Sequence, residues 1–103
     1  MTLRLSQAEL DFLATNVVRP LQKAGYRVSC FGSRARGEGA AYADVDLLIE
    51  GPGKPRKLLG EINERLIESN FPYKVDLVLE ADLAESYREG VMREKIPLPA
   101  QRP

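Results

Sequence analysis

Two short motifs in the first half of the chain contain residue types that can do chemistry. Gly32 and Ser33 follow an apolar stretch, and two aspartates, Asp44 and Asp46, stand at the head of a second apolar run. Glycine lets the backbone approach an anion closely, and serine adds a hydroxyl and an N–H that can bind phosphate oxygens. The order of these residues predicts a phosphate-binding turn beside a pair of carboxylates.

The spacing of the aspartates points to a metal ion. Residues two apart on a strand project from the same face, about 7 Å apart along the backbone, so Asp44 and Asp46 would place two like charges side by side. Such a pair favours a hard cation such as Mg²⁺, which takes oxygen ligands and keeps water and substrate phosphates as the others. If the next strand is a neighbour, Asp76 adds a third carboxylate, and the set could hold one or two metal ions against a triphosphate.

Two arginines follow the serine. Arg34 and Arg36 are long enough to reach phosphate or an acceptor substrate, and we assign both to the nucleotide-binding set with Gly32 and Ser33. Each signal is weak alone, because Gly-Ser turns and Asp-x-Asp pairs are common at ordinary strand ends. Together they favour a functional site, since the three aspartates interrupt runs otherwise made of Val, Leu and Ile.

The flanking sequence predicts the elements that position these residues. A capping box formed by Ser6 and Glu9 begins an amphipathic helix, which Pro20 would kink or end and Gly25 would stop. Apolar runs then predict three strands, at residues 26–31, 45–49 and 73–80. Between the second and third strands, the apolar spacing predicts a helix with a proline in its first turn.

The end of the chain predicts one more helix. Asp82 and Glu85 form an acidic capping pattern that would open it, Gly90 would interrupt it, and it must finish before Pro97. Residues 97–103 are expected to be frayed and flexible.

This order of elements predicts a small α/β or α+β domain. We expect a mixed sheet of three to four strands with helices packed on one face, the other face staying open at the carboxylates. A chain of 103 residues can build one modest core but not two. The prediction is therefore a single domain over residues 1–103, with a catalytic core at about 26–80.

Composition argues against several other classes of protein. Fifteen acidic and fifteen basic residues leave no net charge, which removes the basic footprint expected for stable binding of duplex nucleic acid. Cys30 is the single cysteine and histidine is absent, so neither a disulfide framework nor a Cys/His metal site is expected. No apolar run has the length of a membrane span, and no basic leader precedes one, so we expect a soluble, cytoplasmic protein without a membrane partner.

The residues described above also resemble a known family. The run Phe31-Gly32-Ser33-Arg34-Ala35-Arg36-Gly37, followed by Asp44-Val45-Asp46, is similar to the signature of the polymerase-beta-like nucleotidyltransferase superfamily, and especially of its small members, the minimal nucleotidyltransferases. The resemblance covers about residues 26–80. It implies that Gly32 and Ser33 bind the triphosphate and that Asp44 and Asp46 bind Mg²⁺. Asp76 would complete the metal site and help to activate the attacking hydroxyl.

The family resemblance implies a reaction and a partner. An acceptor hydroxyl would attack the α-phosphate of a nucleoside triphosphate, taking the nucleoside monophosphate, AMP if the substrate is ATP, and releasing pyrophosphate. Minimal nucleotidyltransferases commonly act as antitoxins beside a HEPN-type toxin ribonuclease encoded by the neighbouring gene, and some transfer AMP to a tyrosine of that toxin. Because little chain remains beyond the core, we expect the partner to supply the acceptor site, so that the two chains could form a hetero-oligomer.

Two other functions stay open at this point. The chain could neutralise a toxin by contact alone, with a vestigial site. It could also transfer a nucleotide to a small molecule or to an RNA 3′ end, although such enzymes usually need a second domain.

Overall fold

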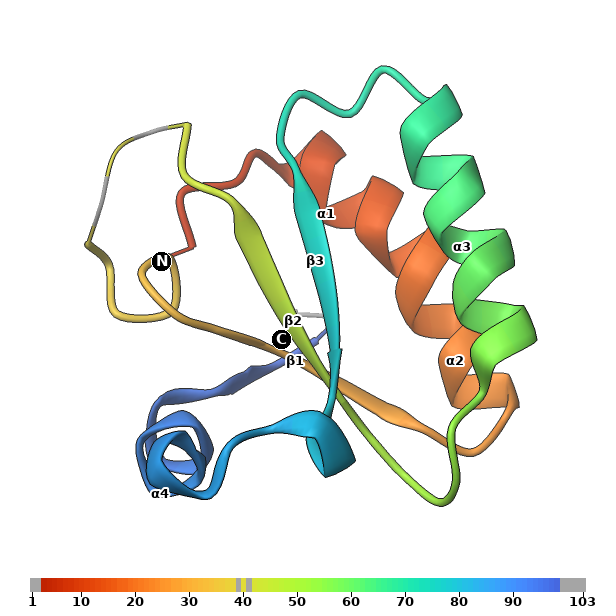
Figure 1. Cartoon of the computed structure of the whole chain (residues 1–103). Coiled ribbons are helices and arrows are strands. Elements are labelled where there is room, and N and C mark those ends of the chain that lie inside the picture. The colour runs from red at the N-terminus through yellow and green to blue at the C-terminus, as the bar shows by residue number, and fades with distance from the viewer. Residues whose placement is uncertain (1–2, 39, 41, 99–103) are drawn as a thin grey trace.

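The computed structural model describes residues 3–38, 40 and 42–98. Their centre is a four-stranded sheet in the order β3-β2-β1-β4, which is strongly twisted (Figure 1). The strands are β1 (Arg27–Phe31), β2 (Val45–Glu50), β3 (Val75–Leu79) and β4 (Ile96–Pro97). β1 runs antiparallel to both β2 and β4, whereas β2 and β3 are parallel. The predicted mixed sheet is therefore confirmed.

The N-terminal helix begins at the predicted capping box. The Ser6 hydroxyl accepts a hydrogen bond from the backbone N–H of Glu9, and the Glu9 carboxylate accepts one from the N–H of Ser6. The helical run that follows consists of α1 (Gln7–Leu13), a π-helical segment (Ala14–Val18) and α2 (Arg19–Lys23). It ends before Gly25, whose φ of 94° is a conformation that glycine adopts at low cost.

Pro20 does not end the helical run. It lies in the first turn of α2, directly after the π-helical segment. A proline has no N–H to donate and its ring crowds the carbonyl of the preceding turn, so a wider turn at this point lets the helix continue.

The later helices differ from expectation at their ends. α3 spans Arg56–Glu68 and α4 spans Glu85–Glu94, passing through Gly90 without a break. Asp82 does not cap α4; it closes a short 3₁₀ turn after β3 and its carboxylate lies 3.1 Å from the Lys54 ammonium. The residue at the N-cap of α4 is Ala84, which makes no side-chain capping bond.

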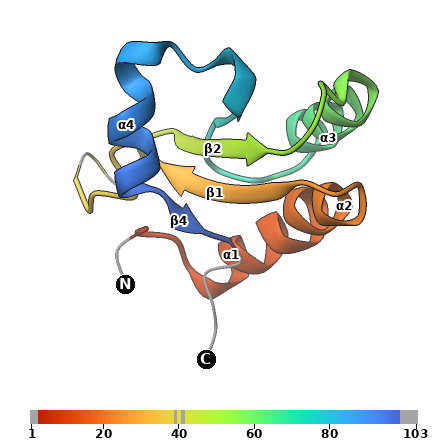
Figure 2. The same ribbon diagram turned by 90° about the horizontal axis from the view of Figure 1, so that it is seen from below.

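The beginning of the predicted frayed segment is part of the sheet. Pro97 pairs with Ser29 of β1, and the N–H of Leu98 donates to the carbonyl of Val28 at 2.9 Å. Leu98 is buried, and the segment covers an edge of β1 that would otherwise be open (Figure 2). The expectation of fraying was wrong for these two residues, and residues 99–103 lie outside the described part of the chain.

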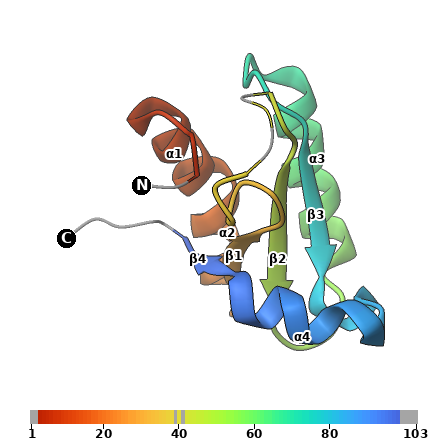
Figure 3. The ribbon, with the colours of Figure 1, turned by 90° about the vertical axis from the view of Figure 1, so that its left-hand side faces the viewer.

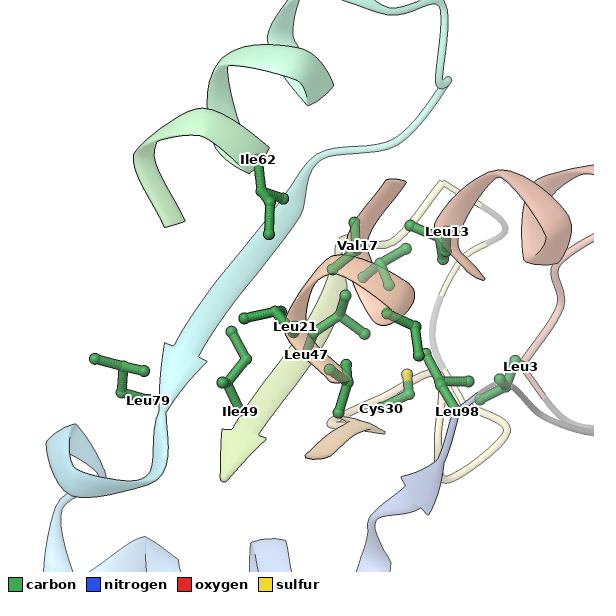
Figure 4. Packing of buried hydrophobic residues seen from close by; sticks show 13 residues of the cluster. Leu3, Leu13, Val17, Leu21, Cys30, Leu47, Ile49, Ile62, Leu79 and Leu98 are labelled. Atoms are coloured by element: carbon green, nitrogen blue, oxygen red, sulfur yellow. The ribbon is translucent and has the colours of Figure 1, made fainter. Parts of the chain in front are cut away.

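The main hydrophobic core lies between the sheet and the helices α1, α2 and α3. Leu47 and Ile49 of β2 and Cys30 of β1 meet Val17 and Leu21 of the N-terminal helix (Figure 4). All five side chains are 1% exposed or less. Within the described residues, no helix is long and apolar enough to cross a bilayer.

α4 lies on the opposite side of the sheet from these helices, so the expectation that the helices pack on one face holds for α1, α2 and α3 but not for α4 (Figures 1 and 3). Because side chains alternate along a strand, Asp46, Leu48 and Glu50 point to this second face. The Glu50 carboxylate is buried and lies 2.8 Å from the ammonium of Lys95, the residue that follows α4. This ion pair fixes the end of α4 over β2, so the second face carries both the helix and the predicted carboxylates.

Candidate active site

The phosphate-binding turn predicted at Gly32 follows β1 directly. Gly32 has a φ of 81°, in the left-handed region that favours glycine. The next residues form overlapping turns, closed by hydrogen bonds from Arg36 N to Gly32 O at 3.1 Å and from Glu38 N to Ser33 O at 2.8 Å. No helix begins here, so any anion would be bound by the backbone N–H groups of a turn rather than by a helix end.

The sheet register brings two of the three aspartates together. On β2, Asp46 stands opposite Phe31 of β1 on one side and opposite Asp76 of β3 on the other. β2 and β3 are neighbours, so the condition under which Asp76 was expected to join Asp44 and Asp46 is met. Asp44 lies two residues earlier, exposed, in the segment leading into β2.

Gly32 and Asp46 touch across the antiparallel pair. A Cβ atom placed on Gly32 would stand 2.5 Å from Asp46 Oδ2, closer than two non-bonded atoms can lie. The absence of a side chain at Gly32 thus lets the Asp46 carboxylate lie directly against the turn. Any phosphate bound by this turn would be adjacent to the aspartates.

The electrostatics of Asp46 reflect this crowding. Its partial burial raises the pKa of Asp46 above its usual value, the carboxylates of Asp76 and Asp44 raise it further, and Arg36 lowers it. The ammonium of Lys74 lies 3.7 Å from the Asp76 carboxylate but is largely exposed, so it compensates little of the repulsion. The cluster has an excess of negative charge that a bound cation would relieve.

The chemistry of these residues fits a divalent ion such as Mg²⁺, because the available ligands are carboxylate oxygens. In the part of the chain that the structure describes, no three acidic, cysteine or histidine side chains already converge as a metal-ligand set. Ligation by all three aspartates would therefore require their side chains to move together.

Arg34 does not point toward the carboxylates. Its side chain is only 1% exposed and donates hydrogen bonds to the carbonyls of Leu3, Arg4 and Ala43 at 2.9 to 3.0 Å. The guanidinium also lies over the Tyr73 ring, 4.3 Å from its centroid. Because Ala43 immediately precedes Asp44, the bond from Arg34 to the Ala43 carbonyl holds in place the segment that leads to the carboxylates. This placement differs from the phosphate contact expected for Arg34.

Arg36 lies on the surface at the turn, and its guanidinium forms ion pairs with Glu38 and Glu94, each at 3.0 Å. Glu94 also accepts a hydrogen bond from the N–H of Gly32 at 2.8 Å. Sequence reasoning missed Glu94, because it lies 58 residues from Arg36 in an ordinary charged helix face. Nothing in its local pattern distinguishes it from the neighbouring glutamates.

The comparison with known families agrees with this arrangement. The model described as "Nucleotidyltransferase domain" matches residues 13–98, which include the turn, all three aspartates and Glu94. The chain belongs to the nucleotidyltransferase domain family. Enzymes of this family generally use a nucleoside triphosphate and a divalent metal.

Individual relatives within the family are small. The chain is 30% identical over 94 residues to "Protein adenylyltransferase MntA" of Thermococcus cleftensis, covering 89% of this chain and 95% of that protein. It is 38% identical over 70 residues to "Probable protein adenylyltransferase MntA" of Haemophilus influenzae, covering 66% of this chain and 60% of that protein.

A solved structure, of a protein provisionally classed as a minimal nucleotidyltransferase, has the same fold. Its TM-score is 0.58 at 34% identity, with 89% of this chain and 87% of that chain covered. The predictions of a nucleotidyltransferase and of its core fold are thus confirmed.

Proposed function

We propose that this protein is a Mg²⁺-dependent protein adenylyltransferase that transfers AMP from ATP to a tyrosine hydroxyl of a partner HEPN-type toxin, and so acts as the antitoxin of the pair. The observation that carries this proposal is the contact of Gly32 with Asp46, which itself stands opposite Asp76. The names of the Thermococcus and Haemophilus relatives support adenylyl transfer to a protein.

We assign the nucleotide phosphates to the turn after β1. The N–H of Gly32 and the guanidinium of Arg36 converge on this position, and we assign Ser33, the next residue of the turn, to the same set. Asp44, Asp46 and Asp76 would hold Mg²⁺, which when bound supplies positive charge to the phosphates and to the entering and leaving oxygens. Arg34 receives a supporting role, because its guanidinium is already bonded to three backbone carbonyls.

Asp76 is best placed to receive the acceptor. β3 is an edge strand of the sheet, and the Asp76 side chain is 38% exposed. Asp76 also lines an open, largely apolar groove of about 650 Å³ between β3 and α3, together with residues such as Leu66, Tyr73 and Val75. Because Asp76 stands opposite Asp46 in the parallel pair, its carboxylate points to the second face of the sheet, and an acceptor segment that starts in this groove would have to pass the edge of β3 to bring its hydroxyl beside Asp76.

The acceptor oxygen forms a bond to the α-phosphorus while the bond from that phosphorus to the bridging oxygen breaks. Pyrophosphate leaves with the electron pair of that bond. The proton of the acceptor hydroxyl passes to the Asp76 carboxylate and from there to solvent.

The test is transfer of label. The protein is incubated with ATP labelled at the α-phosphate, Mg²⁺ and the protein encoded by its neighbouring gene, and the labelled residue is identified by mass spectrometry. We expect AMP on a tyrosine of the partner, no label with Asp46→Asn or EDTA, and normal transfer with Asp82→Asn. Asp82 is a matched control because its carboxylate pairs with Lys54, away from the cluster. Absence of label with the wild-type protein would contradict the proposal.

The same variants separate catalysis from binding alone. If the protein with both Asp44→Ala and Asp46→Ala still neutralises the partner fully, contact is sufficient and the site is vestigial. Transfer to a small molecule or to an RNA 3′ end would appear as label on that acceptor, with the partner protein unlabelled.

A further inference from the structure

Glu94 occupies the donors that we assign to the nucleotide phosphates. Its Oε2 atom accepts the Gly32 N–H at 2.8 Å, and its carboxylate lies 3.0 and 3.2 Å from Arg36 Nη1. One backbone N–H and one guanidinium thus converge on a single anionic group. This is the arrangement of donors expected around a phosphate oxygen.

The Gly32 N–H cannot serve Glu94 and a phosphate at the same time. The Gly32 N–H is a single donor and is fully used by Glu94 at this distance. Arg36 has a second carboxylate partner in Glu38, bound through Nε, so it would remain paired if Glu94 left. Glu94 therefore adds a negative charge at a place where an incoming triphosphate needs a donor.

We propose that Glu94 is a built-in competitor of the nucleotide: its carboxylate holds the phosphate turn in the nucleotide-free protein, and the triphosphate must displace it to bind. The inference rests on the proposed function, in that Gly32 and Arg36 are taken as phosphate donors. A residue of α4, which lies outside the sequence motif, would then control how tightly the nucleotide binds.

The structure restricts how this displacement occurs. The residue after Glu94, Lys95, is held by its ion pair with buried Glu50, and Ile96 pairs with Cys30 of β1. Val91, one turn earlier, is buried. The backbone on both sides of Glu94 is therefore anchored, whereas its side chain is 22% exposed and can rotate toward solvent. We expect a side-chain displacement without movement of α4.

The test measures nucleotide affinity rather than turnover. Binding of a non-hydrolysable ATP analogue with Mg²⁺ is titrated calorimetrically for the wild type, Glu94→Ala and Glu94→Gln. Removing the competitor should tighten binding by roughly tenfold, the equivalent of one charge-assisted hydrogen bond. Glu94→Gln, which keeps the shape of the side chain but not its charge, should give a smaller gain in the same direction. Inorganic tripolyphosphate should show the same gain, because the competition concerns phosphates alone.

Glu89→Ala is the matched control, because Glu89 lies on the exposed face of the same helix and pairs with Arg93 at 3.1 Å. It should leave the affinity unchanged. Weaker or unchanged binding in both Glu94 variants, with wild-type thermal stability, would overturn the inference and make Glu94 a residue that only positions Arg36. That result would leave the proposed function intact, whereas failure of every variant and the wild type to bind the analogue would overturn both.

Discussion

Gly32 and Asp46 meet across the β1–β2 pair so closely that a Cβ on Gly32 would stand 2.5 Å from Asp46 Oδ2. The contact joins the turn that would bind phosphate to the carboxylate that would bind metal. Gly32 directly follows β1, and Asp46 lies on β2 opposite Phe31, so their separation is set by the antiparallel ladder. A change at either residue should affect the other.

Gly32→Ala should abolish nucleotide transfer and destabilise the fold. An alanine at a φ of 81° costs about 1–2 kcal/mol in backbone strain, before the collision with Asp46 is counted. Gly60→Ala is the control, since Gly60 lies in α3 and a Cβ there would have no neighbour within 4 Å beyond the backbone of its own helix. It should stabilise the protein by about 0.5–1 kcal/mol. Chemical denaturation measures the stability of both variants, and equal effects of the two changes would contradict the close contact of Gly32 with Asp46.

Asp46→Asn should raise stability at neutral pH while it removes activity. A carboxyl whose pKa is raised on folding stabilises the folded state below its unfolded pKa, and this contribution is lost as pH rises through the folded pKa. At neutral pH the ionised Asp46 therefore opposes folding, and asparagine removes that penalty. Denaturation in EDTA across pH should show the advantage of the variant shrinking as pH falls below the raised pKa. A variant less stable than wild type at pH 7 would contradict the charge crowding.

The two arginines of the motif should behave differently. Arg34→Ala removes a buried guanidinium from three carbonyls and should lower the free energy of unfolding by about 2–3 kcal/mol. Arg36→Ala removes an exposed side chain and should weaken nucleotide binding with little change in melting temperature. Calorimetric melting and nucleotide titration together separate the two roles. If Arg36→Ala melted earlier than Arg34→Ala, the assignment would be reversed.

Cys30 should not react with thiol reagents in the folded protein. Its side chain is fully buried, and burial raises the pKa of the thiol to about 12, with the Asp46 carboxylate adding to the effect. At pH 8 we expect alkylation by iodoacetamide to proceed no faster than global unfolding, and at once in denaturant. Rapid labelling of the native protein would show that the strand opens locally.

The local sequence pattern was sufficient to predict the features that depend on residues close together in the chain. The capping box at Ser6, the strands around the motif and the helix stop at Gly25 depend on residues within a few positions of one another. The family signature could be read for the same reason, because the turn and the first two aspartates are separated by a short segment. Predictions failed at Asp82 and at residues 97–98, where tertiary partners outweighed the local signal.

The sequence by itself determined which residue types could bind phosphate and metal, and in which order along the chain they occur. Only the tertiary structure decided which of them meet. Asp76 joins Asp46 because β3 lies beside β2, Arg34 turns inward because backbone carbonyls of the N-terminal segment need donors, and Glu94 reaches Gly32 across 62 positions. Such contacts depend on strand order and on the anchoring of α4, which local periodicity does not encode.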